Sequence, residues 1–105
     1  MRKTTKIERI PIIERGNLMI DPQCRIVKLA GKEILLYPKE FDILYLLSQY
    51  PGWVLSSEQI YEAVWNEEGT QCNYEVYNTI CQLKKKLGCP DLIVTVRKCG
   101  YKFMG

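Results

Sequence analysis

The sequence contains no histidine, and this absence limits the chemistry that the chain can perform. Histidine is the commonest general base in enzymes, so a serine or cysteine nucleophile here would have no obvious proton acceptor. We therefore predict a protein that is not an enzyme. The same absence removes mixed cysteine–histidine zinc sites, and no metal ion or other cofactor is expected.

Cysteine is present in an odd number, and no two cysteines form a Cys-x-x-Cys pair. The five are Cys24, Cys72, Cys81, Cys89 and Cys99. This pattern favours reduced thiols that act as small apolar fillers. A thiol-based redox sensor, or a thiol enzyme centred on Cys81 or Cys99, is the alternative that these residues leave open.

Long apolar runs are also missing, because no stretch approaches the roughly 20 residues that a membrane-spanning helix needs. The basic start, Met1 to Lys6, is followed by Ile7-Glu8-Arg9, which interrupts any signal-peptide core. We expect a cytoplasmic protein without membrane contact. The length of 105 residues fits one domain over residues 10–105, preceded by a linker or flexible N-terminus over residues 1–9.

Charge is distributed unevenly, although the formal net charge is only +3. Residues 57–75 carry five acidic and no basic side chains, whereas residues 76–105 carry six basic and one acidic. A positive C-terminal region behind a negative one predicts a directed surface that meets phosphates.

The first third of the chain reads as short strands joined by turns. β-branched and apolar runs alternate with Gly16-Asn17, Asp21-Pro22 and Ala30-Gly31, which predicts an antiparallel meander. The expected strands cover residues 10–13, 18–20, 25–29 and 33–36. We interpret this sheet as a structural platform.

Two helices are expected next. Ile43, Leu47 and Tyr50 fall at helical spacing after Pro38, so the first helix runs from Pro38 to about Tyr50. A short strand over residues 53–55 follows. Ser56 and Gln59 then form a Ser-x-x-Gln capping box that opens a second helix ending at Trp65.

The last thirty residues carry the functional prediction. Val76, Ile80, Leu83 and Leu87 form one apolar stripe on a helix over residues 73–87, which Gly88 ends. The opposite face carries Tyr74, Asn78, Cys81, Gln82 and Lys85, with Lys84 and Lys86 on its flanks. A hairpin over residues 94–103 follows, with Arg97 and Lys98 at its tip. The order sheet, three helices and hairpin predicts an α+β winged helix-turn-helix fold.

From Ile13 to Phe103 the chain resembles the effector domain of OmpR/PhoB-type response regulators. The resemblance rests on residues 16–22, 36–44, 57–65, 76–87 and 95–101, which follow one another at the spacing of that family. It implies sequence-specific binding of double-stranded DNA for transcriptional regulation. It also implies a head-to-tail pair on direct repeats, a possible phosphorylatable receiver domain with its sensor kinase, and contact of the loop Asn66–Gln71 with RNA polymerase. The sequence does not decide whether a receiver was removed or never present.

The resemblance also maps DNA contacts onto this chain. The expected set is Tyr74, Glu75, Asn78, Thr79, Cys81, Gln82, Lys84, Lys85, Arg97, Lys98 and Tyr101. Asn78 and Gln82, with Tyr74 and Glu75, are expected at base edges, where the amide of Gln82 suits adenine. Thr79, Lys84 and Lys85 are assigned to phosphates, and Arg97 to the minor groove through the wing. Trp65 is expected to pack its ring in the core.

Several residues depart from the family pattern. Thr79, Cys81 and Gln82 stand where the family often has a histidine and basic residues. Tyr74 replaces an arginine, Tyr37 replaces a helix-capping threonine at a cost of about 1 kcal/mol, and Lys98 replaces a wing glycine. Because basic residues are missing from the third helix, a protein-interaction module with weak or lost DNA binding is the alternative function.

Overall fold

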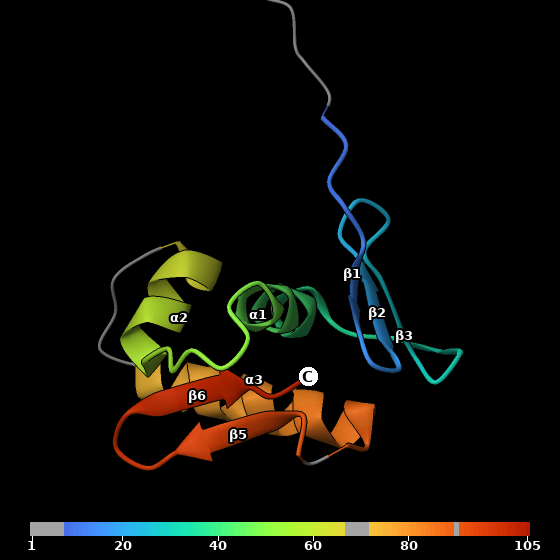
Figure 1. Cartoon of the computed structure of the whole chain (residues 1–105). Helices are drawn as coiled ribbons and strands as arrows, with labels where there is room; N and C mark the ends of the chain where they lie inside the picture. Colours follow the sequence, from blue (N-terminus) through green and yellow to red (C-terminus); the bar gives the residue numbers. More distant parts are fainter. Residues whose placement is uncertain (1–7, 67–71, 90) are drawn as a thin grey trace, which may run out of the picture.

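The computed structural model describes residues 8–66, 72–89 and 91–105, and their fold is the predicted winged helix (Figure 1). Most of the linker expected over residues 1–9 lies outside the described residues. Four strands come first, then three helices and a two-stranded hairpin.

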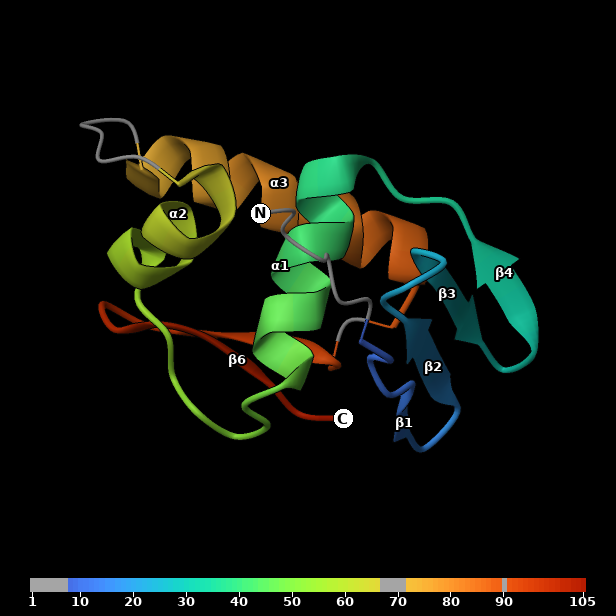
Figure 2. The same ribbon diagram turned by 90° about the horizontal axis from the view of Figure 1, so that it is seen from above.

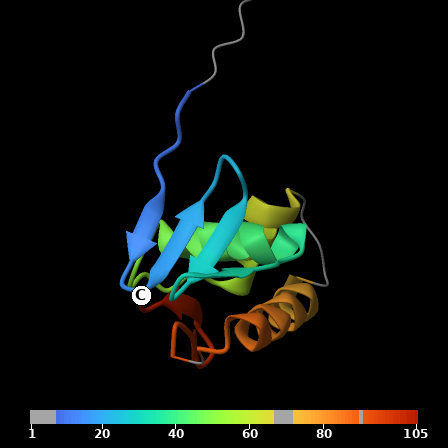
Figure 3. The same ribbon diagram turned by 90° about the vertical axis from the view of Figure 1, so that its right-hand side faces the viewer.

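The N-terminal sheet is antiparallel, with strands β1 (Ile13–Arg15), β2 (Leu18–Asp21), β3 (Ile26–Leu29) and β4 (Lys32–Ile34) in sequential order. Leu18 and Ile20 alternate with half-buried neighbours, so one face of β2 packs into the core. Figure 3 shows the sheet lying across α1 (Pro38–Ser48).

The first and fourth strands differ most from the prediction, and the second and third differ by one residue at one end. The first strand begins at Ile13 rather than Ile10, consistent with Pro11, which has no N–H to give to a ladder. The fourth strand ends at Ile34, the last residue that pairs with β3, and Leu35 beyond it is 79% exposed. The prediction extended this strand because the apolar residues Leu35 and Leu36 follow Ile34, although the pairing with β3 ends at Ile34.

Helix α1 ends at Ser48, two residues before the predicted end near Tyr50. The Tyr50 N–H bonds to the Leu47 carbonyl in a tight turn, and the ring is 39% exposed. Pro51 disfavours helical geometry at the residue before it, which explains the early end. The short strand expected over residues 53–55 is reduced to a single bridge between Leu55 and Tyr101.

Helix α2 (Ser57–Trp65) begins with the predicted capping box. Ser56 Oγ accepts from the Gln59 N–H at 3.1 Å, and Gln59 Oε1 accepts from the Ser56 N–H at 2.9 Å. Each cap satisfies a backbone donor that the first helical turn would otherwise leave without a partner.

Helix α3 (Cys72–Leu87) and the hairpin β5 (Ile93–Val96) and β6 (Gly100–Phe103) complete the fold. The predicted stripe Val76, Ile80, Leu83 and Leu87 is buried, as expected. Figure 2 shows α1 at the centre, with α2 on one side and the sheet on the other. All of these elements contribute to one core, which leaves the outer face of α3 beside the hairpin.

Candidate nucleic-acid interface

The outward face of α3 is available for contact. Asn78, Gln82 and Lys85 are exposed, and their side chains make no hydrogen bond or ion pair with another described residue. Tyr74 is 64% exposed on the same face, and Cys81 is half-buried at its edge. The predicted face is therefore confirmed as a solvent-facing surface of amides, one cation and one exposed aromatic ring.

The two flanks of α3 are held by different parts of the fold. Lys84 Nζ lies 3.4 Å from Thr95 Oγ1 of the wing, whereas Lys86 Nζ lies 2.7 Å from Glu40 Oε1 of α1. Two residues along a helix are separated by roughly 200° around its axis, so these contacts mark nearly opposite sides. Sequence reasoning placed both lysines on flanks and did not identify their partners.

Glu40 is the only charged side chain buried in the described part of the chain, at 3% exposure. Its carboxylate accepts from Lys86 Nζ and, at 2.8 Å, from the Tyr37 backbone N–H. The second bond is one half of a capping box, in which the N3 glutamate accepts from the N–H of the N-cap residue. The other half, in which a threonine hydroxyl would accept from the Glu40 backbone N–H, is not made by the Tyr37 side chain. The Tyr37 side chain makes no capping bond, and Lys86 Nζ lies 3.8 Å from the centre of its ring.

The wing tip is a tight turn that presents two cations. The Cys99 N–H bonds to the Val96 carbonyl at 2.9 Å, and Arg97, Lys98 and Cys99 are exposed. Lys98 has a φ of 64°, so the position has the left-handed geometry that a glycine would adopt without strain. Gly100 is required on the other side of the turn, because a Cβ there would lie 2.0 Å from the Leu55 carbonyl oxygen.

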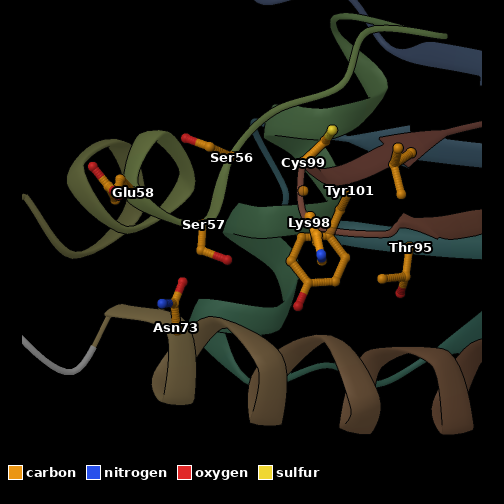
Figure 4. A pocket seen from close by; sticks show the side chains of 10 residues that line it. Ser56, Ser57, Glu58, Asn73, Thr95, Lys98, Cys99 and Tyr101 are labelled. Atoms are coloured by element: carbon orange, nitrogen blue, oxygen red, sulfur yellow. The ribbon is translucent and has the colours of Figure 1, made fainter.

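A hollow of about 360 Å³ separates the wing from the N-terminal ends of α2 and α3 (Figure 4). Ser57, Asn73 and Tyr101 line it from three elements, and the Tyr101 hydroxyl points toward α3. The Tyr101 residue is only 7% exposed; burial raises its pKa, while a hydrogen bond with Ser57 acts in the opposite direction. This predicted contact residue is therefore mostly buried, and it lines the hollow with its hydroxyl directed toward α3.

Three other predicted residues have contacts within the chain. The Thr79 hydroxyl donates to the Glu75 carbonyl at 2.8 Å, which occupies its hydrogen atom. The Cys81 thiol hydrogen-bonds with Tyr77 and thereby raises the pKa of that phenol. Trp65 stacks on Tyr61 with ring centres 5.0 Å apart and packs against the core, as predicted for its ring.

The prediction that the cysteines fill apolar space is wrong for two of them. Cys24 and Cys99 are exposed, because each lies in a turn rather than on a buried face, whereas Cys81 and Cys89 are half-buried. Within residues 8–66, 72–89 and 91–105 no three acidic or thiol side chains gather where a metal ion could bind. No helix in this part of the chain is long and apolar enough to cross a membrane.

Comparison with known families gives a match over residues 31–103 to the family described as "Transcriptional regulatory protein, C terminal". The transcriptional regulatory protein CutR of Streptomyces coelicolor is 39% identical over 100 residues, which cover 95% of this chain and 46% of CutR. QseB of Escherichia coli O157:H7 is 43% identical over 91 residues, covering 85% of this chain and 40% of QseB. The chain thus spans less than half the length of these relatives.

A solved structure with the same fold contains DNA. The DNA-binding domain of Klebsiella pneumoniae RstA, in complex with the RstA box, superposes with a TM-score of 0.82 at 30% identity. The match covers 89% of this chain and 96% of that one.

Proposed function

This chain belongs to the family of C-terminal domains of transcriptional regulatory proteins, and on that basis we propose that α3 and the wing together read a specific DNA sequence. The observation that supports this most directly is the outward face of α3, on which the side chains of Asn78, Gln82 and Lys85 are exposed. A helix with polar side chains free on one face is shaped to enter the major groove.

The proposed contacts divide into base readers and phosphate binders. Asn78 and Gln82 lie one turn apart, and each amide can donate to and accept from the edge of an adenine. Tyr74 and Glu75, with Cys81 at the edge, complete the base-facing surface. Lys85 binds phosphate on this face, and Lys84 does so near the wing, with the Tyr101 hydroxyl as a neutral contact. Thr79 can donate to a phosphate only after its hydroxyl releases the Glu75 carbonyl. Arg97 and Lys98 anchor the wing, with Arg97 in the minor groove.

The decisive experiment is selection from a random duplex pool, followed by titration of the enriched sequence and a scrambled duplex. Arg97→Glu is expected to weaken binding strongly, and Lys28→Glu, which changes the net charge equally at an exposed position of β3, is the matched control. With Lys84, Lys85 and Lys98 on phosphates, the logarithm of affinity should fall with the logarithm of salt concentration at a slope of about −3.

An enriched sequence that is bound far better than scrambled DNA, and lost only with Arg97→Glu, supports the proposal. The second candidate function is a protein-interaction module. It is favoured by the two exposed tyrosines on α3, Tyr74 and Tyr77, at 64% and 56% exposure, because tyrosine is enriched at protein interfaces. No enrichment, or equally weak binding of both duplexes, would favour this module instead.

The longer relatives suggest further partners. We propose that a phosphorylatable receiver, controlled by a sensor kinase, accompanies this domain in the whole protein and that two domains bind direct repeats head to tail. Linking two such domains raises their local concentration at the second site without any new contact. The loop Asn66–Gln71, proposed to touch RNA polymerase, lies almost wholly outside the described residues.

A further inference from the structure

A second hollow, of about 470 Å³, lies on the flank of α3 that faces α1. It is lined by Tyr37, Pro38, Lys39 and Glu40 from the start of α1 and by Asn78, Thr79 and Gln82 from α3. The base-facing amides therefore form one wall of a space whose other wall is the first turn of α1. The wing-side hollow lies across the helix, so α3 is a ridge between two depressions.

The capping of α1 does not explain why a tyrosine stands at position 37 in the lining of this hollow. Tyr37 is 72% exposed, and its side chain gives no capping bond. The ring is nevertheless placed: the Lys86 ammonium lies 3.8 Å from its centre, and that ammonium is fixed by Glu40. The phenol is left as a positioned, solvent-facing donor beside Asn78 and Gln82.

The charge of this hollow suits an anion. The carboxylate of Glu40 is buried and neutralised by Lys86, so it contributes no free negative charge. Lys39 is exposed. Its ammonium donates a 3.2 Å hydrogen bond to the Val64 carbonyl and lies 5.5 Å from the centre of the Trp65 ring. A flexible lysine held this weakly can turn to a phosphate.

We propose that Tyr37 and Lys39 bind the sugar–phosphate backbone along the α1 side of the major groove, opposite the strand that the wing binds. This inference rests on the proposed DNA binding, because the hollow is continuous with the base-reading amides. The major groove is about as wide as a helix, so a helix lying in it has a phosphate backbone along each flank. The mostly apolar hollow accepts deoxyribose, while the phenol and the ammonium meet phosphate oxygens.

The test uses Tyr37→Thr and Lys39→Ala, with Leu35→Thr and Lys28→Ala as controls at exposed positions that do not line this hollow. Lys39→Ala is expected to weaken binding of the operator and of scrambled DNA by the same factor, roughly fivefold, and to reduce the salt slope by about 1. Tyr37→Thr should fold at least as stably as wild type, because threonine can complete the cap, yet bind DNA several-fold more weakly.

Stability and affinity that move in opposite directions at Tyr37 are a result that a purely structural role would not give. Replacing single phosphates with neutral methylphosphonates should locate the contact: one position should weaken wild type and have no effect on Lys39→Ala. If wild type reads DNA and Arg97→Glu abolishes binding, but both α1 variants keep wild-type affinity and slope, this inference is wrong and the proposed function stands. If wild type selects no sequence and Arg97→Glu changes nothing, the proposed function itself fails.

Discussion

The pair between Glu40 and Lys86 offers the sharpest test of how the fold positions α3. Lys86→Met leaves a carboxylate that is 3% exposed without its cation, although the Tyr37 N–H bond stays. Breaking a buried pair in this way costs about 3–5 kcal/mol. Because 29% of the Lys86 side chain is exposed, we expect the lower end, about 3 kcal/mol.

For a domain of this size, that loss corresponds to a melting temperature about 12 °C lower. Urea denaturation followed by circular dichroism measures the free energy of unfolding directly. Lys85→Met, on the exposed face of the same helix turn, is the control and should change stability by less than about 0.5 kcal/mol.

Replacing both partners separates charge burial from packing. Glu40→Met combined with Lys86→Met should recover most of the loss, because no charge is then left in the core. A loss of less than about 1 kcal/mol for Lys86→Met alone would refute the reasoning that Glu40 depends on this cation.

Four further predictions follow from single contacts. Gly100→Ala should lower the free energy of unfolding, measured by urea denaturation, by about 3 kcal/mol, because the added Cβ would overlap the Leu55 carbonyl. Gly16→Ala should lower it by less, because the added Cβ there meets no other atom and only the backbone φ of +57° is strained. Lys98→Gly should raise the free energy of unfolding by about 0.5 kcal/mol, because it relieves the strain of left-handed backbone geometry. The same variant should bind DNA more weakly, and a higher affinity would contradict the assignment of Lys98 to the wing contact. Gln82→Arg should shift the selected base from adenine toward guanine, and an unchanged selected sequence would remove Gln82 from the base readers. Burial raises the pKa of Tyr101, so its neutral phenol contributes fully to the free energy of unfolding below the pKa that it has in the unfolded chain. This contribution is lost as the pH rises through the pKa that it has in the folded protein. Tyr101→Phe should therefore reduce the loss of stability at alkaline pH in urea denaturation.

Local signals in the sequence were enough for most of the architecture. The spacing of Val76, Ile80, Leu83 and Leu87 predicts both the existence of α3 and the face that it buries, because helical period and burial are properties of neighbouring residues. The Ser56–Gln59 box predicts the start of α2 for the same reason. Gly100 next to the charged tip marks the turn of the wing. The outward face of α3 then follows as the side opposite the stripe.

Only the tertiary structure decided which of those surface residues are free. Lys84, Lys85 and Lys86 are identical neighbours in the sequence, yet their ammonium groups differ. That of Lys84 lies beside the wing, that of Lys85 makes no hydrogen bond or ion pair with a described residue, and that of Lys86 is held by a buried carboxylate 46 residues away. The sequence predicted only that Tyr37 fails to cap α1, whereas the structure shows that it also lines a hollow, because α1 packs beside α3. Contacts of this kind depend on how distant elements meet, and no periodicity within a segment records them.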